Sequence, residues 1–196
     1  MITISFRAAE AALAALWLLC RAAVWLRRKT VDWKREALLL LMYVNLAVIL
    51  RVTFFPMYRV GGRIQPLLFH PAAIFPLRIN WVPFVRLKDF ADRREMLLNV
   101  VGNVCLFIPS GVLLPLLDRR LDRFWKVVGA GALMSLGVEL LQLPFSVRST
   151  DIDDLIMNTC GAAIGCGVIC LLRRDGLKKQ SAARLERSSS DEKETE

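Results

Sequence analysis

Five long apolar segments constrain the fold of this chain more than any other feature of its sequence. A helix rises about 1.5 Å per residue, so roughly 20 mainly apolar residues cross a hydrocarbon core of about 30 Å. Hydrophobic residues make up 55% of the 196, and the 23% that are charged fall mostly between these segments, which is the profile of an integral membrane protein. We therefore predict an all-α, polytopic membrane helical bundle with five transmembrane helices, at residues 8–26, 37–55, 96–117, 124–145 and 155–172.

Basic residues predict the orientation of this bundle. Lys and Arg are dense in the linkers 27–36 and 118–126 and at the start of the tail 173–196. With five spans, these stretches lie on one side of the membrane, which the positive-inside rule makes cytoplasmic. We expect the N-terminus outside and the C-terminus in the cytoplasm. The basic residues that give the net charge of +9 then set the topology and interact with anionic lipid headgroups. Membrane lipids, and not nucleic acid, are therefore the expected partners.

The chain divides into three regions. Residues 1–36 hold the first helix, with Arg21 predicted to snorkel toward the surface, and a basic cytoplasmic linker. Residues 37–172 form the main membrane domain with the other four spans, and within it the prolines of the outer segment 56–95 prevent a continuous helix. We expect that segment to lie in the membrane interface or to fold as a lid. Residues 173–196, first basic and then acidic, are predicted to be a disordered cytoplasmic tail.

Three aspartates stand at the start of the fifth span, on the side predicted to be outer. Thr150 or Asp151 suits the N-cap of this helix, and the helix dipole stabilises acidic residues in its first turn. Capping of the helix and interaction with its dipole explain one or two of the three carboxylates. Asp151, Asp153 and Asp154 repel one another, so the others require a cation, a proton or an arginine such as Arg148. A divalent cation held by the three aspartates is therefore one hypothesis, whereas no motif predicts an organic cofactor.

Other spans carry polar residues at the same depth, within roughly 5 to 12 Å of the outer surface at about 1.5 Å per residue. A polar side chain costs a few kcal/mol when it faces lipid, so these groups are expected to face one another in a polar pocket. Glu139 is the strongest signal, although it could also serve only as the partner of Arg51, and the amides could equally be interhelical glue. The candidate pocket comprises Arg51, Asn99, Asn103, Glu139, Gln142, Arg148, Asp151, Asp153, Asp154 and Asn158.

Gly161 and Gly165 are four residues apart in the fifth span. Small residues at this spacing let a neighbouring helix approach closely. This pair predicts a packing face and not a chemical site.

Three blocks resemble the VanZ-like family of bacterial membrane proteins: "NVVGNVCLFIPSGVLLPLL", "SLGVELLQL" and "STDIDDLIMNTCGAAIG". The upstream stretches "RVTFFP" and "NWVPF" are also similar to weaker motifs of that family. The chain departs from the pattern at "PFSVRSTD", where the family more often has a Gly-Arg pair, so Arg148 stands in for that arginine. The matching positions are Asn99, Asn103, Pro109, Gly111, Glu139, Gln142, Asp151, Asp153, Asp154, Asn158 and Gly161.

The resemblance implies a multi-pass protein of the bacterial cytoplasmic membrane and a link to low-level resistance to teicoplanin, a lipoglycopeptide antibiotic. Three functions are open at this point. The pocket recognises a lipid headgroup or a lipid-linked cell-envelope precursor; or the chain is an enzyme of the membrane surface, metal-dependent or with Glu139 as a base; or it is a small transporter with Glu139 as a proton site. The sequence shows no Ser or Cys with a paired His, and it does not reveal an oligomeric state.

Overall fold

The computed structural model describes residues 2–28, 30–55, 59–74, 79–84, 92–145 and 150–194. It confirms the predicted class, because five helices are long and apolar enough to cross a membrane. The helices are α1 (Phe6–Arg28), α2 (Trp33–Phe54), α3 (Arg93–Leu117), α4 (Phe124–Gln142) and α5 (Ile152–Glu194). Their bounds differ from the predicted spans mainly where polar residues extend a helix beyond its apolar part.

Short strands lie outside the five helices and pair with one another. β1 pairs with β4, β2 with β3, and β5 with β6, each as a two-stranded sheet. The turn between β2 and β3 is built on Gly61 and Gly62, whose φ angles of 57° and 74° suit glycine. The strands are β1 (Ile2–Ile4), β2 (Arg59–Val60), β3 (Arg63–Ile64), β4 (Leu67–Phe69), β5 (Ile79–Asn80) and β6 (Thr150–Asp151), and one short 3₁₀ helix, η1, covers Pro71–Ile74.

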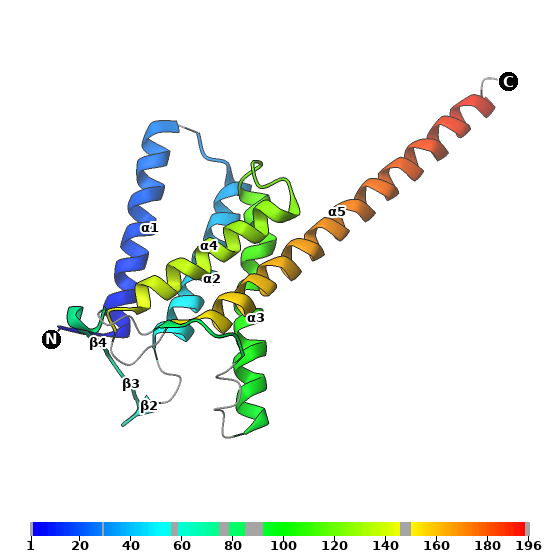
Figure 1. Cartoon of the computed structure of the whole chain (residues 1–196). Coiled ribbons are helices and arrows are strands. Elements are labelled where there is room, and N and C mark those ends of the chain that lie inside the picture. Colours follow the sequence, from blue (N-terminus) through cyan, green and yellow to red (C-terminus); the bar gives the residue numbers. More distant parts are fainter. Residues whose placement is uncertain are drawn as a thin grey trace.

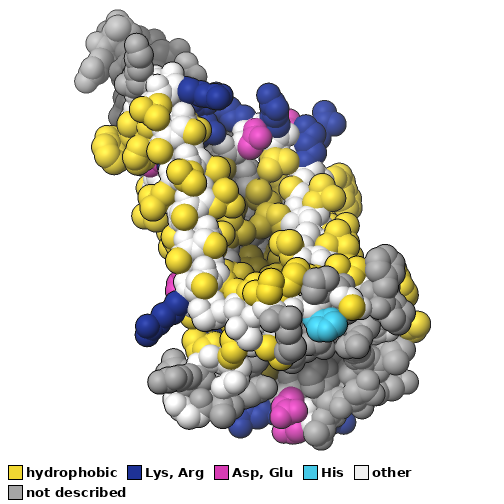
Figure 2. Space-filling view, turned by 90° about the vertical axis from the view of Figure 1, so that its left-hand side faces the viewer, with side chains coloured by type: hydrophobic (Ala, Val, Ile, Leu, Met, Phe, Trp, Pro, Cys, Tyr) yellow, Lys and Arg dark blue, Asp and Glu magenta, His cyan; other side chains and the backbone are white. Residues whose placement is uncertain are grey.

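The helices run alternately up and down, so that the bundle has two distinct ends (Figure 1). The α1–α2 and α3–α4 linkers lie at the same end, which we call the basic end because Arg27, Arg28, Arg120 and Lys126 lie there. The short strands and the start of α5 lie at the opposite end, which we call the acidic end. Figure 2 shows a cluster of Lys and Arg side chains at one end above a broad belt of hydrophobic side chains, with further Lys and Arg side chains toward the opposite end.

The described part of the outer segment packs against the acidic end of the bundle. β4 pairs with β1, and the His70 backbone N–H donates to the Pro144 carbonyl at 2.9 Å. Phe54, Phe55 and Phe145 form a small buried aromatic core beneath it, together with Leu67. The β1–β4 and β5–β6 pairings connect segments far apart in sequence, whereas β2 and β3 form a local hairpin. Of the two arrangements expected for this segment, docking over the helix ends is the one that these contacts describe.

Two local expectations concern the basic end. The Arg21 guanidinium is paired with Glu36 in the first turn of α2, and both side chains are largely buried. Snorkelling of Arg21 toward the surface stays a prediction, and this partner lies on the side toward which Arg21 would reach. The structure continues α5 as a helix to Glu194, where a disordered tail was expected. The segment after the span contains no proline and many good helix formers, which favours extension of a helix that is already nucleated. Disorder of residues 173–196 stays a prediction.

The closest helix contact joins α3 and α5. A Cβ added at Gly161 would meet the carbonyl of Val104, and one added at Gly165 would meet the carbonyl of Ile108. Gly111 of α3 approaches the backbone of Ala162 in the same way. The predicted packing face at Gly161 and Gly165 is therefore confirmed, and its partner is α3 of the same chain.

We predict that Gly165→Ala destabilises the protein by about 1 to 3 kcal/mol, because the new methyl group overpacks the α3–α5 contact. Gly167→Ala is the matched control on the same helix, since a Cβ at Gly167 meets nothing within 4 Å. Unfolding of purified protein in detergent measures both changes. Equal stability of the two variants would show that the close approach does not matter.

Candidate functional site

Glu139 and Asp151 meet at the acidic end, deep between α4 and the start of α5. The two side chains are 3% and 7% exposed, and the Asp151 backbone N–H donates to Glu139 Oε2 at 3.2 Å. A buried carboxylate is costly unless it accepts hydrogen bonds, and this bond fixes the Glu139 carboxylate against β6. The structure thus brings together Glu139 of α4 and Asp151 of β6, which are both predicted pocket residues.

Asp151 also caps α5. Its Oδ1 accepts from the backbone N–H of Asp153 at 3.1 Å and from Asn80 Nδ2 at 3.2 Å. An aspartate directly before the first helical residue commonly accepts such a bond, so the predicted cap is confirmed. The contact from Asn80 was not predicted. It arises because β5 and β6 pair in parallel, with Asn80 opposite Asp151.

Asp153 is held by the segment that follows β5. Its Oδ1 accepts from the Phe84 backbone N–H at 2.7 Å. Phe84 has a φ of 64°, a left-handed conformation that costs a non-glycine residue about 1 to 3 kcal/mol. The bond to the buried, 3% exposed Asp153 side chain helps to maintain this conformation. Asp153 Oδ2 is buried and has no hydrogen-bond partner within the described ranges.

Asp154 faces α3. Asn103 Nδ2 donates to Asp154 Oδ1 at 2.6 Å, and to Asn99 Oδ1 at 3.4 Å. Asn103 and Asn99 are one turn apart, so the pair extends the polar layer from α5 toward the surface of α3. Asn99 itself is exposed and lies at the edge of this layer.

Asn158 and Gln142 lie in the same layer but take separate partners. Asn158 Nδ2 donates to the Ser135 hydroxyl at 2.9 Å, and Gln142 Nε2 donates to the Thr53 carbonyl at 2.7 Å. Both amides connect two helices. Asn158 is 1% exposed, and its Oδ1 has no partner among the residues that the structure describes.

Arg51 lies at the end of α2 near the aromatic core. Its guanidinium donates to the Phe55 carbonyl at 3.0 Å and stands 5.5 Å from the centre of the Phe6 ring. These contacts place Arg51 beside α1 and the C-terminal end of its own helix. Arg148 lies outside the described residues, so its predicted place in the pocket stays a prediction.

The three aspartates turn to different neighbours. Asp151 faces Asn80 and its own helix start, Asp153 faces Phe84, and Asp154 faces Asn103. In the part of the chain that the structure describes, no group of three or more His, Cys, Asp or Glu residues is arranged to hold a metal ion. A divalent cation bound by all three aspartates stays a prediction, and this arrangement does not support it.

Sequence reasoning missed several polar residues that the fold uses. Asn80 and Phe84 come from a proline-rich segment whose position depends on strand pairing. Ser135 of α4 and the pair Asn45 and Ser110 lie within spans, and Ser110 donates to Asn45 Oδ1 at 2.5 Å. A polar side chain within an apolar helix was a usable signal for Ser135, Asn45 and Ser110, because such groups face other helices.

The site as a whole is rich in acceptors. It combines four carboxyl groups with the side-chain amides of Asn80, Asn99, Asn103, Gln142 and Asn158. Such a site suits a ligand that supplies hydrogen-bond donors or positive charge. Fold and site together define a multi-pass helical membrane protein with an acidic polar layer at one end of its bundle.

Comparison with known proteins identifies the family. The family model described as VanZ/LLP1 matches residues 39–173, more than half of the chain, so the chain belongs to the VanZ/LLP1 family. It is also similar to a protein named Protein VanZ from Enterococcus faecium, with 34% identity over 87 residues. That match covers 44% of this chain and 49% of the relative, so it spans about half of the relative's length. No solved structure matches the chain.

We predict that Asn103 and Asp154 are energetically coupled. In a double-mutant cycle with Asn103→Ala and Asp154→Ala, the coupling free energy should be about 1 kcal/mol, as for side-chain hydrogen bonds within membranes and to charged groups. Unfolding in detergent gives the four free energies. Asn103→Ala combined with Asp122→Ala, at the opposite end, should be additive within about 0.5 kcal/mol. Additivity of the Asn103 and Asp154 substitutions would contradict the observed bond.

Proposed function

We propose that the acidic end recognises a donor-bearing polar group of an envelope lipid or of a lipid-linked cell-envelope precursor, and that this recognition underlies resistance to teicoplanin-type lipoglycopeptides. The observation that carries the proposal is the burial of Glu139 within the span α4, hydrogen-bonded to the start of α5. A carboxylate inside a span is expensive and is usually functional.

Two buried acceptors give the proposal its chemistry. Asp153 Oδ2 and Asn158 Oδ1 have no partner among the described residues, and an unsatisfied buried acceptor costs about 1 to 3 kcal/mol. A ligand that donates hydrogen bonds at this end would recover part of that free energy. Amines and hydroxyl groups are the donors that lipid headgroups and sugar-linked precursors carry.

The orientation required by this proposal has the acidic end on the outer face of the bacterial cytoplasmic membrane. Its support is the grouping of basic residues in the linkers at the opposite end, according to the positive-inside rule. The family name adds the link to resistance, because the similar protein from Enterococcus faecium is Protein VanZ. A pocket on the outer face would be accessible to lipid-linked precursors and to antibiotics, since both are exposed on that side of the membrane.

The orientation can be tested by cysteine labelling in intact cells. In a background in which the five native cysteines are replaced, we predict that Val82→Cys reacts with an impermeant maleimide, since Val82 is 58% exposed at the acidic end. Asp122→Cys, in the exposed linker at the basic end, should react only after lysis. The reverse pattern would place the acidic end in the cytoplasm and would remove the basis of the proposal.

The function can be tested by antibiotic susceptibility. A sensitive host that expresses the chain should become less susceptible to teicoplanin but not to vancomycin, and Glu139→Gln and Asp154→Asn should lose this protection. Both substitutions keep the side-chain shape and replace the carboxyl group by an amide. Asp122→Asn, an exposed carboxylate far from the site, is the control and should protect like wild type at equal membrane expression. Full protection by both site variants would show that the carboxylates are not needed.

A further inference from the structure

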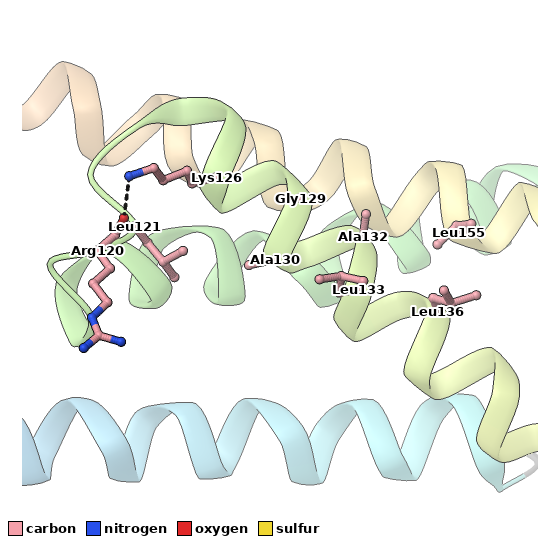
Figure 3. A pocket seen from close by; sticks show the side chains of 9 residues that line it. All are labelled: Arg120, Leu121, Lys126, Gly129, Ala130, Ala132, Leu133, Leu136 and Leu155. Carbon is pink, nitrogen blue, oxygen red and sulfur yellow. Dashed lines mark hydrogen bonds between the residues drawn. The ribbon is translucent and has the colours of Figure 1, made fainter.

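A second feature begins at the basic end of the bundle and follows α4 as far as Leu155, which neighbours Asp154 in sequence. A groove of about 820 Å³ runs along the open side of α4 and is bounded by the α3–α4 linker. Figure 3 shows Arg120 and Lys126 where the linker joins α4, and the apolar side chains along the helix beyond them. The residues that define it here are Arg120, Leu121, Lys126, Gly129, Leu133 and Leu136.

The groove has the length of one half of a membrane. At about 1.5 Å per residue, the α4 segment from Lys126 to Leu136 is about 15 Å long, which is half of a hydrocarbon core of about 30 Å. Leu133 and Leu136 are 70% and 40% exposed, so their surfaces face outward from the bundle. Gly129 leaves a trough in this face, because a Cβ built there meets nothing within 4 Å.

The polar end of the groove is positively charged. Lys126 Nζ donates to the Arg120 carbonyl at 3.0 Å and to Asp122 at 2.7 Å, which holds the linker against α4. Among the described residues, the exposed Arg120 guanidinium has no ion-pair partner. Arg119 and Arg123 add further positive charge in the same linker. A guanidinium suits bidentate binding of a phosphate group.

We propose that this groove binds one anionic glycerophospholipid, with its phosphate at Arg120 and one acyl chain along Gly129, Leu133 and Leu136. Charge selects the occupant, because Lys126 is already paired with Asp122, whereas a neutral lipid would leave Arg120 without a counter-charge among the described residues. A basic residue near the surface contributes about 1 kcal/mol toward anionic lipid. The volume is within the range of about 300 to 1,000 Å³ that is typical of ligand pockets. The inference is independent of the acidic site and of the function proposed for it.

The test uses the full chain purified in a neutral detergent and titrated with phosphatidylglycerol or with phosphatidylcholine of the same acyl chains. Native mass spectrometry counts bound lipid, and thermal unfolding reports stabilisation. We expect one tightly bound phosphatidylglycerol per chain and a larger rise in Tm than with phosphatidylcholine. Arg120→Gln should weaken phosphatidylglycerol binding about fivefold, the equivalent of about 1 kcal/mol.

Gly129→Leu should abolish the bound phosphatidylglycerol, because its side chain projects into the open trough. Gly137→Leu is the matched control: Gly137 lies on the same helix, a Cβ there also meets nothing within 4 Å, and it does not line the groove. Equal binding of the two lipids by wild type, or retention of the lipid by Gly129→Leu, would overturn the proposal. The proposal would also be overturned if the wild-type chain were a dimer and Gly129→Leu a monomer, because the groove would then hold a second copy of the chain. If Gly129→Leu fails to fold, unchanged binding by Arg120→Gln would overturn it alone.

Discussion

The close packing of α3 against α5 is the contact on which the rest of the structure depends. Glycine at positions 161 and 165 lets the backbone of α5 rest on carbonyl groups of α3, and such approach is the main route to helix association where lipid removes the hydrophobic driving force. The same contact brings Asp154 within 2.6 Å of Asn103. A larger side chain at either glycine would separate the helices and, with them, the two halves of the polar layer. Packing and site are therefore set by the same residues.

Among the described residues, the buried polar side chains within the spans face a neighbouring helix or strand. On α4 the buried residues are Val127, Gly131, Ser135, Glu139 and Gln142, mostly four residues apart, so they form a single stripe. Gly131 of this stripe meets Ala162 of α5, and Ser135 accepts from Asn158. Apart from Lys126 in its first turn, α4 can thus carry a carboxyl group at one end and still present an apolar face to lipid, since one stripe holds its other polar side chains.

Hydropathy predicts much of this architecture because membrane spans need long apolar runs, and all five predicted spans correspond to helices. Depth along the spans also predicts that Asn103 and Asp154 lie at one level, since the rise per residue of a helix is constant. The pairing of Arg21 with Glu36 was missed because it depends on the rotation of two helices about their axes, which hydropathy does not fix. Asn80 and Phe84 were missed for another reason. Their contacts with the aspartates follow from strand pairing across about seventy residues of sequence, and no local pattern encodes such a closure.

Under the proposed function, the contacts of Asn80 and Phe84 decide which acceptors of the acidic layer a ligand could use. Asn80 donates to Asp151 Oδ1 and the Phe84 N–H donates to Asp153 Oδ1, so a ligand that binds either oxygen must compete with the protein's own donors. Asp153 Oδ2 and Asn158 Oδ1 are not used in this way by the described residues. Binding at those two acceptors adds hydrogen bonds without breaking any that the structure describes, whereas displacement of Phe84 would break a bond and release a strained backbone. Recognition therefore costs least beneath the segment, at the level of Asn158, and this is where the donor of a ligand headgroup would be most strongly stabilised.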